Sequence, residues 1–548
     1  MEIKRISIIS SEPNIPVGGS YHDIMPVFGP LIIATILNNH GYEVKVFEER
    51  LYPMDWDFIL SSDVVGLYTM TCTVRRVMQH SARIKAHNPD IVTITGGTHP
   101  SEMPEDTLRF CDYVVRKEGD VTLLDLLDAL QTGRDLSTVQ GISYKMGGKI
   151  IHNEDRPFVE DIDVPLDMSL IHLFKSDPPW KLKLMGSKVL NVIQATRGCP
   201  FTCSFCYGIR QLGVGYRMRS IDSLIQEIKD RMAYSESDKF LFVDNHFVAN
   251  PRYTRELLLR MKEEGIRFSW CLVFTRIEVY KHEDILKLME DVGITNLHIG
   301  LESFNNASLD YYNKHQSRDQ VIEALTTIKK YKLRISGSFV LGTDVDTVKT
   351  TRETVDVALK YGVHNYIGFS LMEFPNLSSP GLVPYNRMVI RDYDYGNGTF
   401  VFYFPKNMRP SVLQREMNNG MRRFYLHKIL DDIKELNFHE LYYKLSHFPL
   451  FMSMSKHWKD HVHYLEKMEQ GMYDDEDHLI EAKLGEGIFP PDTIRPWLPE
   501  VQANVVHPPM MMIPTGQVRV PAGYGKNTAG RETGIELEPL PVMVQMGD

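Results

Sequence analysis

The first 135 residues alternate between two patterns of apolar positions. Five segments are short apolar runs or alternate in polarity with period two, as strands do, and apolar residues recur at helical spacing between them. The predicted strands are residues 6–10, 42–48, 64–70, 91–95 and 113–116, and the main predicted helices are 30–40, 74–87 and 123–130. This alternation predicts a doubly wound α/β domain, Rossmann-like or flavodoxin-like, with a parallel sheet. The flavodoxin-like strand order suits five strands.

A second series of strand and helix patterns runs from residue 190 to residue 371. The predicted strands are 190–195, 239–244, 268–275, 295–300, 334–341 and 365–371, and the predicted helices are 220–232, 253–264, 282–292, 318–331 and 348–361. About six strand–helix units of roughly 30 residues each predict a partial (β/α)6 barrel of the TIM type.

The C-terminal third changes pattern twice. Residues 411–435 read as a helix, and residues 441–467 read as a helical stretch rich in His, Tyr, Phe and Met. Such residues more often form core, although they could instead cover the barrel mouth and shape an apolar substrate site. Ten of the 30 prolines lie between Pro490 and Pro541, which predicts an extended or disordered tail. The predicted domains are 1–135, a linker 136–188, the barrel 189–385, a helical region 386–475 and the tail 476–548.

Composition narrows the class of protein. The 548 residues are 43% hydrophobic and 24% charged, which are ordinary globular values. The net charge of −10 disfavours a nucleic-acid partner, and six cysteines are too few for a secreted disulfide scaffold. No signal peptide is evident and no apolar run approaches about 20 residues, so we expect a cytoplasmic protein without a transmembrane segment.

Three of the six cysteines lie within eight residues. Cys199, Cys203 and Cys206 have the spacing C-x3-C-x2-C, and the other three cysteines are isolated. A structural zinc site usually has four protein ligands in paired knuckles, and no second C-x2-C pair exists in the sequence. Three thiolates fit a 4Fe–4S cluster in which the fourth iron is open to another ligand.

The cysteine motif resembles a known signature. With Phe205 as the aromatic residue, C-x3-C-x-aromatic-C is similar to the motif of radical S-adenosylmethionine (SAM) enzymes. The resemblance implies that the amino and carboxylate groups of SAM chelate the open iron. One electron from the reduced cluster then cleaves SAM to methionine and a 5′-deoxyadenosyl radical. Radical SAM cores are six-unit barrels, so the predicted element count agrees with the motif.

The resemblance also implies where SAM binds, because functional residues of such barrels lie at the carboxyl ends of strands. The residues expected to contact SAM are Phe205, Tyr207, Asp244, Arg276, Glu302, Ser303, Gly337 and Gly342. Glu302 resembles the carboxylate that accepts from the ribose or pairs with the ammonium of SAM. Asp244 stands where many relatives have Gly-Gly-Glu. The alternative for each polar residue is a helix cap or loop contact, and for Glu302 an ion pair with a base such as Arg276.

Ligands of doubly wound sheets bind beyond the carboxyl ends of the strands. No G-x-G-x-x-G motif follows the first strand, which disfavours a dinucleotide site. A doubly wound domain before a radical SAM barrel resembles the cobalamin-binding class, in the branch of hopanoid methylases and the anaerobic magnesium-protoporphyrin ester cyclase. The strings that carry the resemblance are FGPLIIATILNNHGYEV, ITGGTHPSEMPED, YVVRKEGD, VIQATRGCPFTCSFC and FVFYFPKNMRPSVLQ.

The residues then expected to contact cobalamin are Thr69, Thr71, Gly96, Gly97, Thr98, His99, Glu118 and Gly119. Alternatively, Gly96 and Gly97 only make a tight turn from strand to helix. The Asp-x-His-x-x-Gly loop that supplies a cobalt ligand in other cobalamin domains is absent, so the lower cobalt face is not ligated through that motif. Cys72 could face the same cavity, but plain packing is the preferred interpretation for it.

The resemblance implies a cobalamin-dependent enzyme that methylates an unactivated carbon of a small or lipid-like molecule, through a 5′-deoxyadenosyl radical and methylcobalamin. Its electron donor would be a flavodoxin or ferredoxin. The first alternative is a radical SAM oxidative cyclase or rearrangement enzyme without net methyl transfer. An RNA methylthiotransferase is remote, because the first 190 residues hold only two cysteines and no basic RNA-binding domain is visible. A cobalamin sensor or carrier is disfavoured, because it needs no cysteine triplet.

Overall fold

The computed structural model describes most of the chain. The described residues are 2–15, 26–174, 190–373, 382–438, 441, 444–445, 448–485, 487–488 and 505–506. All of them belong to one unit, Met1–Met511. The predicted tail lies largely outside the described residues, so its extended character stays a prediction.

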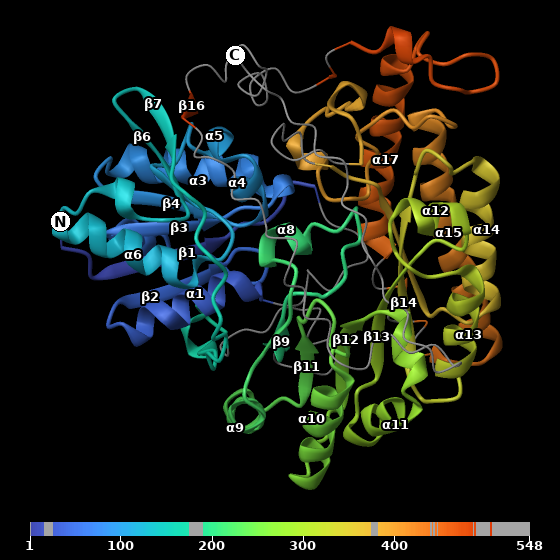
Figure 1. The fold of residues 1–548 in the computed structure, drawn as a ribbon, viewed down its shortest axis with the longest axis horizontal. Coiled ribbons are helices and arrows are strands. Elements are labelled where there is room, and N and C mark those ends of the chain that lie inside the picture. Colours follow the sequence, from blue (N-terminus) through green and yellow to red (C-terminus); the bar gives the residue numbers. More distant parts are fainter. Residues whose placement is uncertain are drawn as a thin grey trace, which may run out of the picture. The chain divides into compact units, whose positions relative to one another are not determined.

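The N-terminal strands form a parallel sheet in the flavodoxin-like order. They are β1 (Arg5–Ser10), β2 (Glu43–Glu48), β3 (Val64–Tyr68), β4 (Val92–Gly96) and β5 (Tyr113–Val115). Their order is β5-β4-β3-β1-β2, and every neighbouring pair is parallel. The doubly wound prediction is therefore confirmed (Figure 1).

Helices cover both faces of this sheet because its strands are apolar on both sides. Ile6 and Ile8 of β1 pack in one core with helices α1 (Phe28–Asn39) and α6 (Gly119–Thr132). Ile9 points to the other face, where α2 (Trp56–Leu60) and α3 (Val74–His87) pack. Two short helices, α4 (Thr98–Glu102) and α5 (Pro104–Thr107), follow β4 and bring the chain to β5.

The segment assigned to a linker contains part of the sheet, which corrects the sequence interpretation. Strands β6 (Ile142–Met146) and β7 (Lys149–His152) form an antiparallel hairpin that extends the sheet beyond β5. Its turn, Gly147-Gly148, has φ values of 59° and 79°, a conformation that glycine adopts without strain. A short strand, β16 (Val505–Val506), pairs with β7.

The barrel has six parallel strands in chain order. They are β8 (Asn191–Ile193), β11 (Lys239–Phe242), β12 (Trp270–Thr275), β13 (Asn296–Glu302), β14 (Arg334–Leu341) and β15 (Asn365–Ser370). Among the described residues β8 and β15 do not pair with each other, so the barrel is open, as predicted. Its helices are α9 (Ile221–Ser235), α10 (Pro251–Glu263), α11 (Glu283–Val292), α13 (Arg318–Ile328) and α14 (Val348–Lys360) (Figure 1).

Shorter elements surround the cysteine loop. Strands β9 (Thr196–Arg197) and β10 (Arg217–Met218) form a small antiparallel pair on either side of it, and helix α8 (Gly208–Leu212) follows the last cysteine. Helix α12 (Asn306–Tyr311) lies between β13 and α13 in the chain.

The C-terminal region packs on the barrel through aromatic residues. Helices α15 (Pro410–Lys434) and α17 (Phe448–Met468) follow a buried segment that includes Phe400 and Phe402. This segment shares a core with Trp458 of α17 and Val340 of β14. That packing supports the core interpretation for these aromatic residues. No helix within the described ranges is long and apolar enough to cross a membrane.

Candidate functional site

The three clustered cysteines occupy one tightly bonded loop between β9 and α8. The Cys206 amide donates to the Cys203 carbonyl at 3.0 Å, and the Ser204 amide donates to the Tyr312 carbonyl at 3.0 Å. Gly198, just before the loop, has φ of 91°, and a Cβ there would lie 2.7 Å from the Gly215 carbonyl oxygen. Only glycine fits this position, so the entry to the loop is fixed by its own backbone.

The chemistry of these thiols suits an iron–sulfur cluster. Burial raises the pKa of Cys199 to about 11 and also raises the pKa of Cys206, while the Arg276 guanidinium works against the shift at Cys199. Buried thiolates therefore need a positively charged partner, which iron would supply. Within the described ranges, no three His, Cys, Asp or Glu side chains are placed so that they could hold a single metal ion. A cluster differs from such a site because each cysteine binds a different iron atom.

Arg276, predicted to contact SAM, points at the cysteine loop. Its Nη1 donates to Cys203 Sγ at 3.2 Å, and its Nη2 donates to the Lys314 carbonyl at 2.6 Å. The carboxylate of Glu278 accepts from the same guanidinium at 3.0 and 3.2 Å. Arg276 is thus held by groups of the protein on several sides.

Glu302 ends β13 in a strained conformation. Its φ is 61°, in the left-handed region, and the pairing of β13 with β14 shifts register between Gly300 and Glu302. Its Oε1 lies 2.8 Å from Lys314 Nζ, and each side chain is only 5% exposed. Strain of this kind is concentrated at functional sites, because the surrounding structure must hold it in place.

Lys314 was missed by the sequence analysis, and the partner suggested for Glu302, Arg276, was wrong. Lys314 lies in the loop after α12 rather than at a strand end, so no positional signal marked it. Its neighbours Asn313 and His315 also have positive φ values, of 51° and 53°. These two strained residues turn the Lys314 side chain inward.

Other predicted SAM residues serve the fold itself. The buried carboxylate of Asp244 accepts from the Thr196 hydroxyl and the Ala195 amide, and burial raises the pKa of Asp244 to about 6. The Ser303 hydroxyl accepts from the Asn305 amide at 3.0 Å. For these residues the structure favours the alternative of local contacts.

The two predicted SAM glycines are also explained by packing. A Cβ on Gly337 would lie 2.8 Å from the Leu301 side chain. Gly342 has φ of 100°, and a Cβ there would clash with the Leu413 side chain and the Tyr403 hydroxyl. Neither glycine needs a ligand to account for it.

His246 lies at the end of the barrel that holds the cysteine loop, and the sequence analysis gave it no role. Its side chain is fully buried, and its Nε2 has no hydrogen-bond partner within the described residues. Burial lowers its pKa to about 3, so the imidazole is neutral. An unpartnered buried nitrogen beside the cysteine loop, where the Phe201 ring centroid lies 5.8 Å away, fits a site that a polar ligand completes.

A cavity of about 390 Å³ joins the sheet edge to the cysteine loop. From the predicted residues it brings together Thr71 and Thr98 of the N-terminal domain with Phe205 and Tyr207 of the loop. The other lining residues are Pro13, Arg50, Met70, Cys72, Arg210, Val340, Phe369, Ser370, Leu371, Met372, Glu373, Gly396, Asn397 and Gly398. Cys72 therefore faces the cavity, which the sequence analysis considered and did not prefer.

Several predicted cobalamin residues do not line this cavity. The hydroxyls of Thr69 and Thr95 bond to each other at 2.8 Å, and buried His99 contacts Asp106 and Thr71, each at 3.3 Å. A Cβ on Gly119, at the start of α6, would lie 3.1 Å from the Ile33 side chain. These residues pack beneath the sheet edge and support it.

Glu118 joins the two domains instead. Its carboxylate pairs with Arg197 at 3.1 Å and with Arg217 at 2.9 Å, both beside the cysteine loop. The Tyr207 hydroxyl donates to the Thr98 carbonyl at 3.0 Å across the same contact. Residues expected to bind cobalamin thus hold the sheet edge against the loop.

Gly96 and Gly97 make the turn from β4 to α4. Gly97 has φ of 119°, and a Cβ there would lie 2.6 Å from the Thr69 carbonyl oxygen, whereas a Cβ on Gly96 meets nothing nearer than 3.4 Å. Thus the protein's own backbone fills the space beside Gly97, as the tight-turn alternative requires.

We expect Gly97→Ala to lower the free energy of unfolding by more than about 1 kcal/mol, because it adds both strain and a clash. Thermal denaturation measures this effect. Gly133→Ala is the matched control, since Gly133 also has positive φ (75°) but open space around it. An unchanged melting temperature with lost cobalamin binding would instead assign Gly97 to the ligand.

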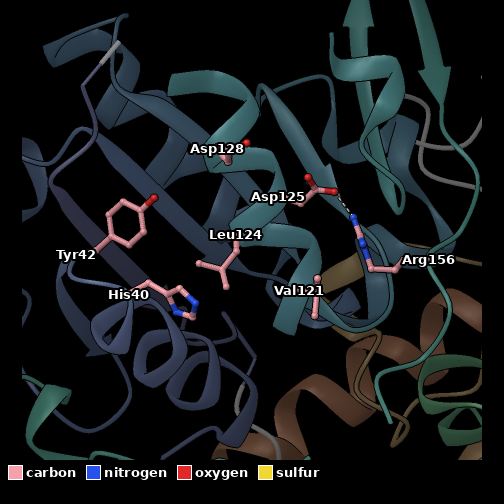
Figure 2. A pocket seen from close by; sticks show the side chains of 7 residues that line it. All are labelled: His40, Tyr42, Val121, Leu124, Asp125, Asp128 and Arg156. Atoms are coloured by element: carbon pink, nitrogen blue, oxygen red, sulfur yellow. Dashed lines mark hydrogen bonds and ion pairs between the residues drawn. The ribbon is translucent and has the colours of Figure 1, made fainter. Parts of the chain in front are cut away.

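A second hollow lies on the N-terminal domain, among α1, β2 and α6. Figure 2 shows His40 and Tyr42 on one side of it and an Asp125–Arg156 ion pair on the other. It contains none of the residues predicted for cobalamin, SAM or the cluster.

Comparisons with known proteins agree with both halves of the site. Residues 15–127 match the B12 binding domain model, and residues 193–358 match the radical SAM superfamily model. An uncharacterized methyltransferase of Pyrococcus horikoshii is 30% identical over 56% of this chain and 66% of its own length. The anaerobic magnesium-protoporphyrin IX monomethyl ester cyclase of Rubrivivax gelatinosus is 26% identical over 67% of each protein. A hopanoid C-2 methylase of Rhodopseudomonas palustris is 25% identical over 60% of this chain and 58% of its own.

The fold has a solved counterpart. A radical SAM methyltransferase from Kitasatospora setae, determined with cobalamin and a 4Fe–4S cluster, superposes with a TM-score of 0.55 at 15% identity. The match covers 68% of this chain and 73% of that one. At this identity the likeness concerns the fold. This chain spans 58% to 67% of the length of the curated relatives described above.

Proposed function

Because the chain belongs to the cobalamin-binding radical SAM superfamily, we propose that it methylates an unactivated carbon of a small or lipid-like molecule. The cavity between the sheet edge and the cysteine loop carries this proposal, because Thr71 and Thr98 line it together with Phe205 and Tyr207. When bound, the cluster and SAM would supply a 5′-deoxyadenosyl radical and cobalamin would supply a methyl group. The six free cysteines suit a reducing cytoplasm, and a flavodoxin or ferredoxin would provide electrons.

In this proposal the protein's own residues bind and orient the cofactors and exclude water from the site. Cys199, Cys203 and Cys206 hold the iron atoms. The Glu302 carboxylate would face the ammonium of SAM, and the Lys314 ammonium would face its carboxylate. Both side chains are buried, where such contacts are strong. Apolar side chains such as Leu371 and Met372 line the cavity and keep water from a radical.

The apolar lining also supports the substrate class. Val340, Phe369, Leu371 and Met372 form much of the wall opposite the sheet edge. Such a wall favours an apolar substrate portion, with polar groups at Arg50 or Arg210 fixing its orientation.

The second candidate is an oxidative cyclase or rearrangement enzyme without net methyl transfer. The similarity to the Rubrivivax gelatinosus cyclase favours it, since that alignment covers more of this chain than do those with the other two curated relatives described above. Both candidates use the same cluster, so only the fate of the methyl group separates them.

Incubation with methyl-labelled SAM separates the two candidates without a known substrate. We expect the anaerobically reconstituted protein, supplied with reduced cobalamin and dithionite, to form 5′-deoxyadenosine and to move label to cobalamin. Mass spectrometry of both products measures this. 5′-Deoxyadenosine without label on cobalamin would support the second candidate, and neither product would contradict both. Thr98→Trp, which fills the cavity from the sheet side, should reduce label on cobalamin more than 5′-deoxyadenosine.

A further inference from the structure

We propose that Arg276 is a tuning residue for the cluster: its hydrogen bond to Cys203 raises the reduction potential and keeps the cluster reducible by its electron donor. The inference rests on the proposed function only in that the cysteine loop holds a 4Fe–4S cluster. It departs from the sequence expectation, which gave Arg276 to SAM.

The first argument is the direction of the guanidinium. Its Nη1 lies 3.2 Å from Cys203 Sγ, and its central carbon lies 3.9 Å from the centre of the Phe201 ring. The side chain is 6% exposed, so little water competes for its donors. An N–H group aimed at a buried cysteine sulfur is one of the features that set the potential of an iron–sulfur cluster.

The second argument is that an ion pair alone does not explain this arrangement. Glu278 lies two residues away in the chain and already accepts from Nε and Nη2 of Arg276. A third acceptor, the Lys314 carbonyl at 2.6 Å from Nη2, comes from a distant segment. Because guanidinium is a planar fork with five N–H donors, these bonds leave Nη1 directed at the sulfur.

The third argument is that the segment supplying this carbonyl is itself fastened to the cysteine loop. The Asn313 side-chain amide donates to the Thr202 carbonyl at 3.2 Å, and the Ser204 amide donates to the Tyr312 carbonyl. Residues 312–314 therefore hold the loop on one side and Arg276 on the other. Any change in the register of this segment would move Nη1 relative to Cys203.

The expected chemistry follows from charge. Reduction adds one electron to the cluster, and an N–H donor with a positive charge next to a cysteine sulfur stabilises the more negative state. The carboxylate of Glu278 partly offsets that charge. Arg276 and Glu278 should therefore shift the potential in opposite directions, although they are partners in one ion pair.

Potentiometric titration of the reconstituted protein without SAM, followed by electron paramagnetic resonance of the reduced cluster, tests the proposal. We expect Arg276→Gln to lower the ratio of reduced to oxidised cluster about tenfold at a fixed solution potential, which is about 59 mV for one electron. Arg276→Lys keeps the charge but loses the fork, so its shift should be smaller. Glu278→Gln should shift the potential upward.

Arg231→Gln is the matched control. Arg231 is a buried arginine that pairs with Glu227 in α9 and donates to the Val192 and Leu166 carbonyls rather than to a cysteine. The Arg231→Gln variant should have a lower melting temperature and an unchanged reduction potential of the cluster. If Arg276→Gln only lowers the melting temperature, or if Glu278→Gln shifts the potential downward or not at all, Arg276 is a structural ion-pair partner and the proposal fails.

Two further outcomes are distinguishable. If Arg276→Gln assembles no cluster, the direction of the shift in Glu278→Gln decides the question. If the wild-type protein itself binds no cluster, the proposed function fails together with this inference. If Arg276→Gln shifts the reduction potential as expected but the wild-type protein moves no label to cobalamin, the tuning role is upheld. Only the proposed methyl transfer is then contradicted.

Discussion

Replacement of Cys199, Cys203 or Cys206 by alanine is expected to abolish SAM cleavage, the largest effect that any single substitution in this chain should have. The wild-type protein should bind about four irons after anaerobic reconstitution, because three cysteines and one open position complete a 4Fe–4S cluster. Each cysteine holds a separate iron, so loss of one leaves a cluster with two open positions. Iron content and 5′-deoxyadenosine formation measure the result.

The remaining cysteines provide the controls. Cys111 and Cys271 are buried in the cores of the two domains, and Cys72 lines the cavity. Burial raises the pKa of Cys72 and of Cys111 to about 12, much as it raises that of Cys199 to about 11, so the pKa does not set these cysteines apart. They differ because each is isolated in the sequence, whereas the three cluster cysteines lie within eight residues. Alanine at the isolated positions should leave the iron content unchanged. Loss of iron in any of these control variants would show that the ligands are assigned wrongly.

The order of elements could be predicted because buried strands and capped helices leave local signals. Helix α3 (Val74–His87) and strand β14 (Arg334–Leu341) have the predicted bounds. Ser220 caps α9, near the start of the predicted helix 220–232, by accepting from the Ser223 amide. Such signals depend only on neighbouring residues, so they can be recognised without knowledge of the fold.

The β6–β7 hairpin shows the limit of those signals. Its Gly147-Gly148 turn is typical of a two-residue hairpin, but the flanking strands are only five and four residues long and partly exposed. Its pairing partner, β5, comes before a helix of 14 residues. Strands this short do not stand out by pattern alone, and pairing with β5 establishes them in the sheet.

The partners of site residues could be predicted least. Glu118 pairs with Arg197, which is 79 residues away, and Glu302 pairs with Lys314 on a loop rather than at a strand end. Arg276 and Glu302 lie at the carboxyl ends of their strands, as predicted, because that end is fixed by topology. The motifs could not show which loop returns to meet these residues, since that depends on contacts between distant segments.

Glu302→Gln should weaken SAM binding by one to two powers of ten while the cluster still assembles. A charge-assisted hydrogen bond contributes about 1.5–3 kcal/mol, which corresponds to that change in the dissociation constant. Glu302 is not an iron ligand, so iron content should be unchanged. Isothermal titration of SAM under anaerobic conditions measures the affinity.

The ion pair with Lys314 complicates a single substitution, because glutamine leaves a buried ammonium without its counter-charge. Such a loss is itself destabilising. We therefore expect Glu302→Gln to lower the melting temperature as well. The double variant Glu302→Gln, Lys314→Met removes both charges and keeps the approximate volume, so it should recover most of the lost stability.

SAM affinity of the double variant then separates the two roles of Glu302. If the carboxylate binds SAM, stability returns but affinity stays low, because no anion faces the ammonium of SAM. If Glu302 only stabilises the barrel, affinity returns together with the melting temperature. The second outcome would reject the SAM role and leave a structural ion pair at the end of β13. Lys314→Met alone completes the cycle: it should weaken SAM binding further only if the ammonium contacts the SAM carboxylate.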